Sequence, residues 1–307
     1  MSLTITKSHT GVLLQDFGRY GHAPYGITVG GPADAYAFSW ANYLLNNSTN
    51  NSVIEVTLGQ ASFTVNHDTW FAIAGGNLGV TLDHTPIENW SSFQAHKGQI
   101  IRFKRPINGL RAYLAVKGGF QVTPIMGSVA TVSRDQLGGS QQNGQSLRVN
   151  DILSYKKHTH CMSRQFTSFR FIPDYNQDLY LRVIEGYQCS IFDPQTLKDF
   201  YSTNYQVGKD SNRMGYRLKG KALNNCRLNT LSEGLALGSI QLTPQGLPIV
   251  MLADHQTIGG YPKVGCVSQV DLPRLAQAKP GQSIHFQPGN LNELQQAWCR
   301  WAQFFGY

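Results

Sequence analysis

The amino-acid sequence predicts a mainly β protein with two related domains and a few short helices. Apolar and polar residues alternate in short runs that turn residues separate, as expected of half-buried strands. The 31 glycines among 307 residues suit many tight turns. Motifs of the first half also recur in the same order in the second half, and such self-similarity indicates a duplicated unit.

Seven runs show the strand pattern most clearly. They are residues 63–65, 70–73, 100–103, 112–116, 181–184, 249–252 and 283–286. Each is bounded or followed closely by residues that favour turns.

Four helices are expected, three from their start signals and one from the Pro280–Gly281 stop that follows it. Asp34 is a candidate N-cap for a helix that ends near residue 45, and Asp193 precedes a proline at the first helical position. Residues 271–278 predict one short helix. Asn290, with Glu293 three residues later, predicts a C-terminal amphipathic helix. Its aromatic stripe suits packing on the chain's own body or docking on a partner.

The duplication rests on four pairs of similar segments. Residues 16–21 and 210–215 both read D-x-x-R-x-G, and the other pairs are 55–59 with 233–238, 72–75 with 250–254, and 98–103 with 281–286. The polar stretch between the copies predicts domains at 1–165 and 166–307, the second ending in the amphipathic helix.

Composition excludes several classes of protein. The net charge of +8 comes from scattered Lys and Arg residues, which indicates a solvated basic surface or a small anionic substrate rather than nucleic acid. Five cysteines without a C-x-x-C pair predict neither a metal site nor a disulfide framework. With no apolar leader and no run of about 20 apolar residues, we expect a cytoplasmic protein without membrane contact.

Residues 254–263 concentrate polar groups directly after a predicted buried strand. Asp254, Gln256, Tyr261 and Lys263 bring a carboxylate, a carboxamide, a phenol and an ammonium around the Gly259–Gly260 turn. Glycines let a backbone approach a ligand closely, so the segment is a candidate site. The alternative is a glycine turn whose polar side chains bind the local backbone.

Arg19 and Arg213 occupy matching places in the two copies. A guanidinium binds carboxylate or phosphate with two parallel hydrogen bonds, so both are candidate substrate contacts, and Lys263 adds positive charge. The alternative is that each arginine pairs with the aspartate of its own motif, Asp16 or Asp210, and fixes a turn.

Two further carboxylates are candidates. Glu233 would act as a general base if it is buried, or would pair with an arginine in a structural role. Asp34 is first a helix cap, although a helix N-terminus next to glycines also suits an anion. Phosphate-binding loops of the usual kind are absent, so direct ATP binding is not indicated.

Several of these segments resemble one known family. Residues 15–19, 31–34, 212–218, 232–234, 238–241 and 254–263 are similar to the carboxyltransferase-type proteins called allophanate hydrolase subunit 2 or the 5-oxoprolinase C subunit, and to the carboxyltransferase region of urea carboxylase. The similarity runs from about residue 14 to 286. The chain has Gly30, Asn212 and His255 where the family usually has Ser, Asp and Arg.

The resemblance implies two cyclophilin-like β-barrel domains with a cleft between them. It also implies a heteromer with a partner of the subunit 1 type, also called the B subunit, and a third protein that completes ATP-dependent cleavage of 5-oxoproline to glutamate. No directly bound cofactor is expected, because ATP is used by the whole complex.

The first functional hypothesis is therefore one subunit of an amide hydrolase. Its expected catalytic residues are Glu233, Asp254, Tyr261 and Lys263, and its expected substrate-binding residues are Arg19, Asp34, Arg213, Gln241, Gln256, Gly259 and Gly260. A second hypothesis is a carboxyltransferase subunit that acts on urea or a similar amide, with biotin carried by a partner. A third is a non-catalytic regulator that binds the subunit 1 type protein.

Overall fold

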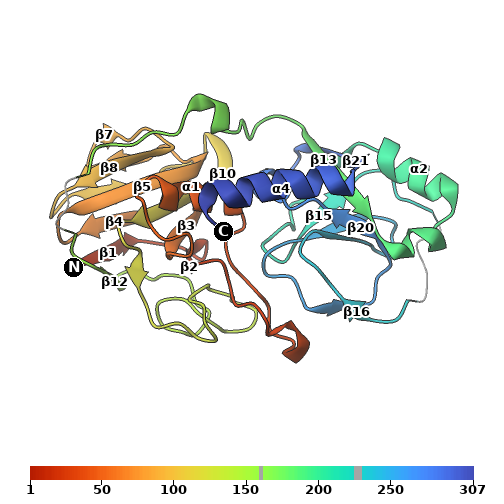
Figure 1. The fold of residues 1–307 in the computed structure, drawn as a ribbon, viewed down its shortest axis with the longest axis horizontal. Helices are drawn as coiled ribbons and strands as arrows, with labels where there is room; N and C mark the ends of the chain where they lie inside the picture. The colour runs from red at the N-terminus through yellow and green to blue at the C-terminus, as the bar shows by residue number, and fades with distance from the viewer. Residues whose placement is uncertain (159–161, 225–229) are drawn as a thin grey trace. The chain divides into compact units, whose positions relative to one another are not determined.

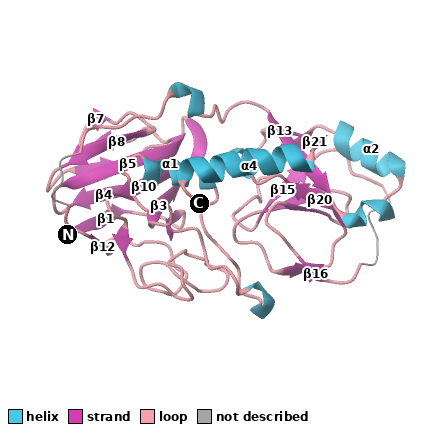
Figure 2. Ribbon diagram, in the orientation of Figure 1, coloured by secondary structure: helices cyan, strands magenta, loops and turns pink. Residues whose placement is uncertain are grey.

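A computed structural model describes residues 1–158, 162–224 and 230–307 (Figures 1 and 2). The chain divides into two compact units. The first unit contains Met1–Tyr20 and Gly30–Tyr175, and the second contains Gly21–Val29 and Asn176–Tyr307. Strands dominate both units and helices are few, which confirms the mainly β prediction.

The first unit contains two antiparallel sheets. The seven-stranded sheet runs β11 (Phe120–Gln121), β12 (Ile152–Tyr155), β1 (Ser2–Lys7), β4 (Ser62–Val65), β9 (Ile100–Arg102), β6 (Thr81–Leu82) and β7 (Thr85–Pro86). The five-stranded sheet runs β2 (Val12–Gln15), β3 (Val53–Thr57), β10 (Asn108–Val116), β5 (Thr69–Asn77) and β8 (Ser91–Ala95).

The two sheets of the first unit share one hydrophobic core. Side chains from β1, β4 and β9 join side chains from β2, β3, β5 and β10 in a single buried cluster. Phe71 of β5 meets Tyr155 of β12 edge-to-face, with ring centroids 6.2 Å apart. This contact crosses from one sheet to the other, so the alternating pattern read from the sequence buries one face of each sheet against its partner.

The helix predicted after Asp34 is present as α1 (Ala35–Tyr43). The Asp34 carboxylate accepts a hydrogen bond from the backbone N–H of Ala37 at 2.9 Å, which satisfies one of the free N–H groups of the first turn. The helix packs on β5, β10 and β3 of the five-stranded sheet. At Gly75 of β5, an added Cβ would lie only 3.2 Å from the Cβ of Ala37, so glycine lets the helix approach the sheet.

The second unit is built on a closed seven-stranded barrel. Its strands follow the order β13 (Leu179–Glu185), β20 (Lys263–Val267), β17 (Ser239–Leu242), β18 (Pro248–Met251), β15 (Gly215–Lys219), β14 (Tyr205–Val207) and β21 (Ser283–Pro288). The parallel pairing of β13 with β21 closes the barrel, and its other pairings are antiparallel.

The helices predicted in the second half of the chain are present, and Asp193 and Asn290 cap two of them. They are α2 (Pro194–Ser202), α3 (Leu272–Ala276) and α4 (Leu291–Phe305). Asn290 caps α4 by accepting from the N–H of Glu293 at 3.2 Å. Helix α2 packs on β21, where the rings of Phe200 and Phe286 stack at 4.6 Å.

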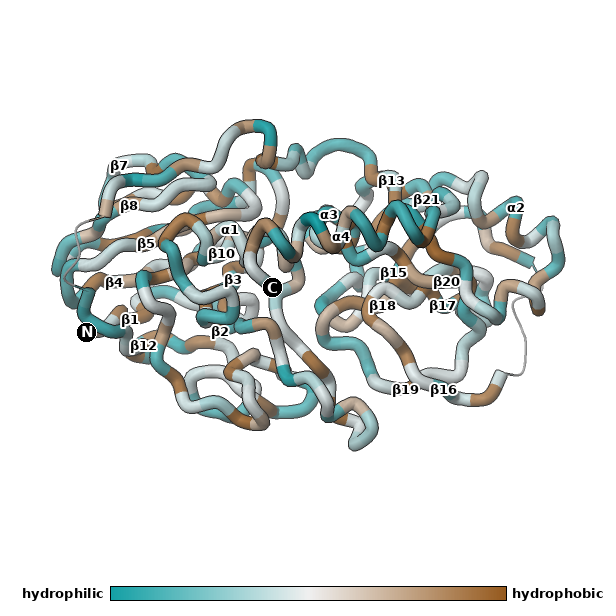
Figure 3. Tube along the Cα trace, in the orientation of Figure 1, coloured by the Kyte–Doolittle hydropathy of each residue, from teal (hydrophilic) through white to brown (hydrophobic). Residues whose placement is uncertain are grey.

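Helix α4 is amphipathic, as Figure 3 shows by the alternation of hydrophilic and hydrophobic residues along it. Leu294 and Phe305 are buried, whereas Leu291 and Phe304 are exposed. Its aromatic stripe also contains the neighbouring rings of Trp298 and Trp301, 5.2 Å apart.

The remaining elements are short. The described part of the chain contains three 3-10 helices, η1 (Ala23–Tyr25), η2 (Phe169–Phe171) and η3 (Tyr187–Ile191). A separate two-stranded sheet pairs β16 (Glu233–Gly234) with β19 (Ile258–Gly259). Within the described ranges, no helix has the length and hydropathy of a bilayer-spanning segment.

The cap of α2 gives a stability prediction. Asp193 accepts from the N–H of Thr196 at 2.8 Å and from its hydroxyl at 2.9 Å. Replacing Asp193 with Ala removes both acceptors and is expected to lower the free energy of unfolding by about 1 kcal/mol. Urea unfolding followed by circular dichroism measures the loss. The matched control, Asp193→Asn, keeps a capping oxygen and should retain most of the stability; equal losses in both variants would contradict the capping role.

Candidate functional site

The two-stranded sheet β16–β19 and the barrel strand β20 bring together two of the predicted catalytic residues, Glu233 and Lys263, in the second unit. Glu233 lies opposite Gly259, and Gly234 lies opposite Ile258. The register of β17 with β20 places Gln241 opposite Lys263. These pairings bring residues that are more than 20 positions apart in the sequence into one site.

Glu233 lies at the centre of this site. Its Oε1 atom is 2.7 Å from the ammonium nitrogen of Lys263, and the two side chains are 29% and 17% exposed. Lys263 also donates to the backbone carbonyl of Gly234 at 3.1 Å. The ion pair is therefore partly withdrawn from water but still accessible, the condition in which charged groups remain both paired and reactive.

Two residues that the sequence did not single out complete the surroundings of Glu233. The hydroxyl of Tyr187 donates to Oε2 of Glu233. The buried side chain of Gln188 donates through Nε2 to Oε1 of Glu233 at 2.7 Å and accepts from the backbone N–H of Lys263 at 2.7 Å. Gln188 therefore binds both members of the ion pair and fixes their relative position.

Tyr187 and Gln188 lie on η3, directly after strand β13. A short 3-10 helix has no periodic sequence pattern by which it could be predicted. The one local signal that could have drawn attention to Tyr187 and Gln188 is that two polar residues follow a glycine at a strand end. The Lys263 ammonium also lies 5.9 Å from the centroid of the Tyr187 ring, within the range of a cation–π contact.

The Gly259–Gly260 turn borders the ion pair. A Cβ at residue 259 would lie 2.8 Å from Nε2 of Gln241 and 2.9 Å from Cδ1 of Leu235, so any larger residue there must displace one of these side chains. Gln241 is 1% exposed and donates to the backbone carbonyl of Tyr261 at 3.1 Å. This hydrogen bond from the buried Gln241 amide fixes the backbone of the turn at Tyr261, whose side chain is exposed.

Asp254 and Arg213 form a two-point ion pair. The Nε and Nη2 atoms of Arg213 each lie 2.8 Å from a different oxygen of Asp254, and both side chains are largely buried. The Asp254 N–H also donates to the backbone carbonyl of Arg213 at 2.9 Å. The arginine therefore pairs with Asp254 rather than with Asp210 of its own motif, and each charge of the pair is offset by the other.

The two residues after Asp254 lie at the same strand end. The buried His255 has Nδ1 2.7 Å from the backbone carbonyl of Gln256. Because a carbonyl only accepts, Nδ1 carries the proton of this hydrogen bond. Thr28 donates to the backbone carbonyl of His255 at 3.3 Å. The Gln256 side chain is partly exposed.

Arg19 lies in the first unit, in the loop that follows β2. Its Nη2 donates to the backbone carbonyl of Ala130 at 2.7 Å. Gly138 leaves room for this contact, because a Cβ there would lie 1.9 Å from the same carbonyl oxygen and 2.8 Å from Nη2 of Arg19. The structure thus gives Arg19 a defined role in joining two loops of its own unit.

Asp34 also lies in the first unit, in a buried polar network. Besides capping α1, its carboxylate accepts from the hydroxyl of Tyr175 at 3.1 Å, and its N–H donates to the hydroxyl of Tyr113 at 2.7 Å. Tyr113 in turn donates to Glu55 at 2.8 Å. Burial, and next the Glu55 charge, raise the pKa of Tyr113 well above its usual value, so this phenol stays protonated.

Glu55 and Glu233 are matched by the sequence repeat but differ in surroundings. Glu55 is fully buried and lies 3.7 Å from Nε of Arg111, whereas Glu233 is partly exposed beside Lys263. Of the two carboxylates, Glu233 is therefore the one that a ligand could reach.

The described residues contain no group of three or more His, Cys, Asp or Glu side chains placed to hold a metal ion. Burial raises the pKa of the Cys266 thiol to about 11, and burial also raises the pKa of Cys189. Both thiols are protonated near neutral pH, so neither is an activated nucleophile. Cys161 and Cys226 lie outside the described residues.

The site arrangement suits proton transfer next to a polarised carbonyl. A carboxylate accepts protons, while an ammonium and a phenol donate hydrogen bonds within the same cluster. Gly260 and the exposed Tyr261 follow directly in sequence from the strand that pairs with Glu233.

The Gly259 packing gives a testable prediction. Gly259→Ala is expected to lower the melting temperature and displace β19, because its methyl group meets Gln241 and Leu235. Gly260→Ala is the matched control, since its Cβ would meet only the Ser232 hydroxyl at 3.1 Å. Thermal unfolding of both variants checks the difference. Equal melting temperatures would show that residue 259 does not need close packing.

The raised thiol pKa gives a second prediction. At pH 8 the Cys266 thiol is protonated, so iodoacetamide should alkylate it slowly in the native chain, with a rate that rises toward pH 11. Because the folded pKa lies above the unfolded one, the associated stabilisation is complete below pH 9 and is lost as the pH rises toward 11. Mass spectrometry of Cys266 peptides after timed alkylation measures this. Rapid labelling at pH 8 under native conditions would contradict it.

Comparisons with known proteins identify the family of the chain. The family model described as "Carboxyltransferase domain, subdomain A and B" matches residues 25–288. The C subunit of the Escherichia coli 5-oxoprolinase is 34% identical over 96% of this chain and 94% of its own length. The protein of the same name from Haemophilus influenzae is 32% identical over 91% of this chain and 89% of its own length.

A solved structure extends the similarity to the fold. The crystal structure of the Kluyveromyces lactis urea carboxylase superposes with a TM-score of 0.89 and 25% identity over 99% of this chain. The chain spans 29% of the length of that structure. On these grounds the chain is a homologue of the 5-oxoprolinase C subunit, and it belongs to the family of carboxyltransferase domains, subdomains A and B.

Proposed function

We propose that the chain is the C subunit of a heteromeric, ATP-dependent 5-oxoprolinase, which cleaves 5-oxoproline to glutamate. The observation that carries the proposal is the partly exposed Glu233–Lys263 ion pair, with Tyr187 and Gln188 bound to the same carboxylate. The near full-length similarity to two proteins of this name supports the choice of reaction.

The proposed chemistry is hydrolysis of the lactam C–N bond. Lys263 donates a hydrogen bond to the carbonyl oxygen as it gains negative charge, and such a donor contributes about 3–4 kcal/mol to a hydrolytic transition state. Tyr187 uses its single O–H to hold the Glu233 carboxylate in place. Glu233 takes a proton from the attacking water as the C–O bond forms, and that proton is passed to the departing nitrogen as the C–N bond breaks. The partner subunits supply the ATP-dependent step.

In this proposal, the other predicted residues border the substrate or position the groups that contact it. Tyr261 and the Gly259–Gly260 backbone border the substrate, and Gln241 holds their turn. Asp254 acts through Arg213, because the two charges are already paired. The substrate contacts expected of Arg19, Asp34 and Gln256 remain part of the proposal.

We also propose that both units descend from one duplicated, cyclophilin-like β-barrel, with domains at 1–165 and 166–307. The closed barrel of the second unit and the single core shared by the two sheets of the first support this origin. The proposed partners are a subunit 1 type protein, the B subunit of the complex, and a third 5-oxoprolinase subunit, together in the cytoplasm. The names of the two bacterial relatives, each one subunit of a larger enzyme, support a multisubunit complex.

A second candidate function is transfer of a carboxyl group to urea or a similar amide, with biotin carried by a partner. The observation that favours it is the TM-score of 0.89 to the urea carboxylase structure. A lysine and a carboxylate around an N–C=O group would serve this reaction too.

Reconstitution separates the two functions. We expect ATP-dependent loss of 5-oxoproline only when this chain and its partner subunits are combined, and no effect of avidin, which sequesters biotin. Avidin inhibition, or urea-dependent consumption of bicarbonate, would instead support the carboxyltransferase. An active complex that does not need this chain would refute both.

The role of Glu233 is tested in the same assay. Glu233→Gln keeps the shape and removes the base, so kcat should fall by about 10²–10⁴-fold, the usual contribution of general base catalysis. Glu88→Gln, on the exposed surface of the first unit, is the control and should leave kcat unchanged. Near-normal kcat in Glu233→Gln would exclude it as the base.

A further inference from the structure

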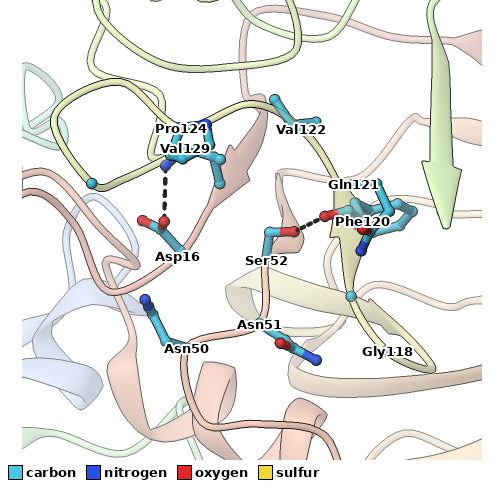
Figure 4. A pocket seen from close by; sticks show the side chains of 12 residues that line it. Asp16, Asn50, Asn51, Ser52, Gly118, Phe120, Gln121, Val122, Pro124 and Val129 are labelled. Atoms are coloured by element: carbon cyan, nitrogen blue, oxygen red, sulfur yellow. Dashed lines mark hydrogen bonds between the residues drawn. The ribbon is translucent and has the colours of Figure 1, made fainter. Parts of the chain in front are cut away.

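The first unit contains a cavity that the proposed reaction does not use. Its volume is about 230 Å³. Its lining comes from the loop after β2, the segment before β3, strand β11 and the turns on either side of that strand (Figure 4). The lining residues are Asp16, Asn50, Asn51, Ser52, Gly118, Gly119, Phe120, Gln121, Val122, Pro124, Gly127 and Val129.

Hydrogen bonds hold the walls of this cavity in place. The carboxylate of Asp16 accepts from the N–H of Gly18 at 3.0 Å, from the N–H of Val129 at 2.8 Å and from the hydroxyl of Ser128. On the opposite side, the Ser52 hydroxyl donates to the carbonyl of Phe120 at 2.8 Å. Figure 4 shows both anchors facing the same space, so the cavity exists before any ligand enters.

The lining also contains side-chain carboxamides whose hydrogen-bonding groups are not all used by the protein. Within the described residues, the side-chain amides of Asn51 and Gln121 make no hydrogen bond. Asn50 uses its oxygen to accept from the N–H of Phe17 at 2.8 Å, which leaves its NH₂ group available. Asn51 lies tightly against Gly119, where an added Cβ would be 2.9 Å from the Cβ of Asn51.

The charge of the cavity selects against ionised ligands. Asp16 is the only ionisable side chain among the lining residues. Its negative charge disfavours an anion, and because it already accepts three hydrogen bonds it does not need a cation for compensation. The side-chain carbons of Val122, Pro124 and Val129 add a small apolar surface.

We propose that this cavity is a second binding site, which takes a small uncharged carboxamide. Carboxamides present a donor and an acceptor side by side, and the Asn51 and Gln121 amides offer the reciprocal pair. The apolar wall receives the ligand's short alkyl part. The site lies in the first unit and shares no residue with the Glu233–Lys263 site of the second.

A series of three ligands of similar size tests the charge selection. Propionamide, propionate and n-propylammonium have nearly the same size and differ in charge at pH 7. Titration of the ¹⁵N-labelled full chain should shift the side-chain NH₂ signals of Asn51 and Gln121 with propionamide. Propionate and n-propylammonium should bind at least about three-fold more weakly, the effect expected for losing one hydrogen bond of ordinary strength.

Variants locate the site. Asn51→Leu should weaken propionamide binding at least about three-fold, the loss expected for one hydrogen-bonding partner. Asn292→Leu is the matched control, an exposed asparagine of α4, and should bind as the wild type does. Gln121→Leu provides a second test at the exposed rim if Asn51→Leu does not fold.

Three results would overturn the proposal. One is the absence of any propionamide shift at Asn51 and Gln121 up to molar concentration. Another is equal or tighter binding of propionate or n-propylammonium. The third is unchanged propionamide affinity in folded Asn51→Leu or Gln121→Leu. These measurements use neither 5-oxoproline nor ATP. Their outcome therefore does not depend on whether the proposed reaction is correct.

Discussion

The ion pair between Glu233 and Lys263 is the interaction on which the proposed site depends. The 2.7 Å separation places opposite charges where partial burial strengthens their attraction. Partial burial costs both groups some of their hydration, and the attraction between them offsets part of that cost. Gln188 contributes by binding the carboxylate of one residue and the backbone of the other.

The fold of the second unit explains how this pair is assembled. Lys263 begins β20 of the closed barrel, whereas Glu233 lies on β16, outside the barrel. The pairing of Glu233 with Gly259 and of Gly234 with Ile258 brings β16 to this place, and glycine at residue 259 keeps its close contacts with Gln241 and Leu235 free of strain. A rigid barrel therefore supplies the lysine, and a short two-stranded sheet brings the carboxylate to it.

Local sequence signals predicted local structure well. The caps Asp34, Asp193 and Asn290 were predicted correctly because each capping bond joins residues three positions apart. The cluster 254–263 was recognisable because its polar groups are contiguous. The partners of charged residues were harder to predict, because they can be distant in the sequence. Arg213 pairs with Asp254, 41 positions away, and not with the nearby Asp210. Tyr187 and Gln188 were missed because only the barrel brings η3 to β20.

The central claim is that Glu233 and Lys263 act as one unit. A double-mutant cycle of Glu233→Gln and Lys263→Met, read as kcat/KM of the reconstituted complex, measures this coupling directly. The account predicts strong non-additivity, with the double variant losing little more activity than the worse single variant. Fully additive losses, or single variants with unchanged kcat/KM, would show that the two charges act independently or not at all.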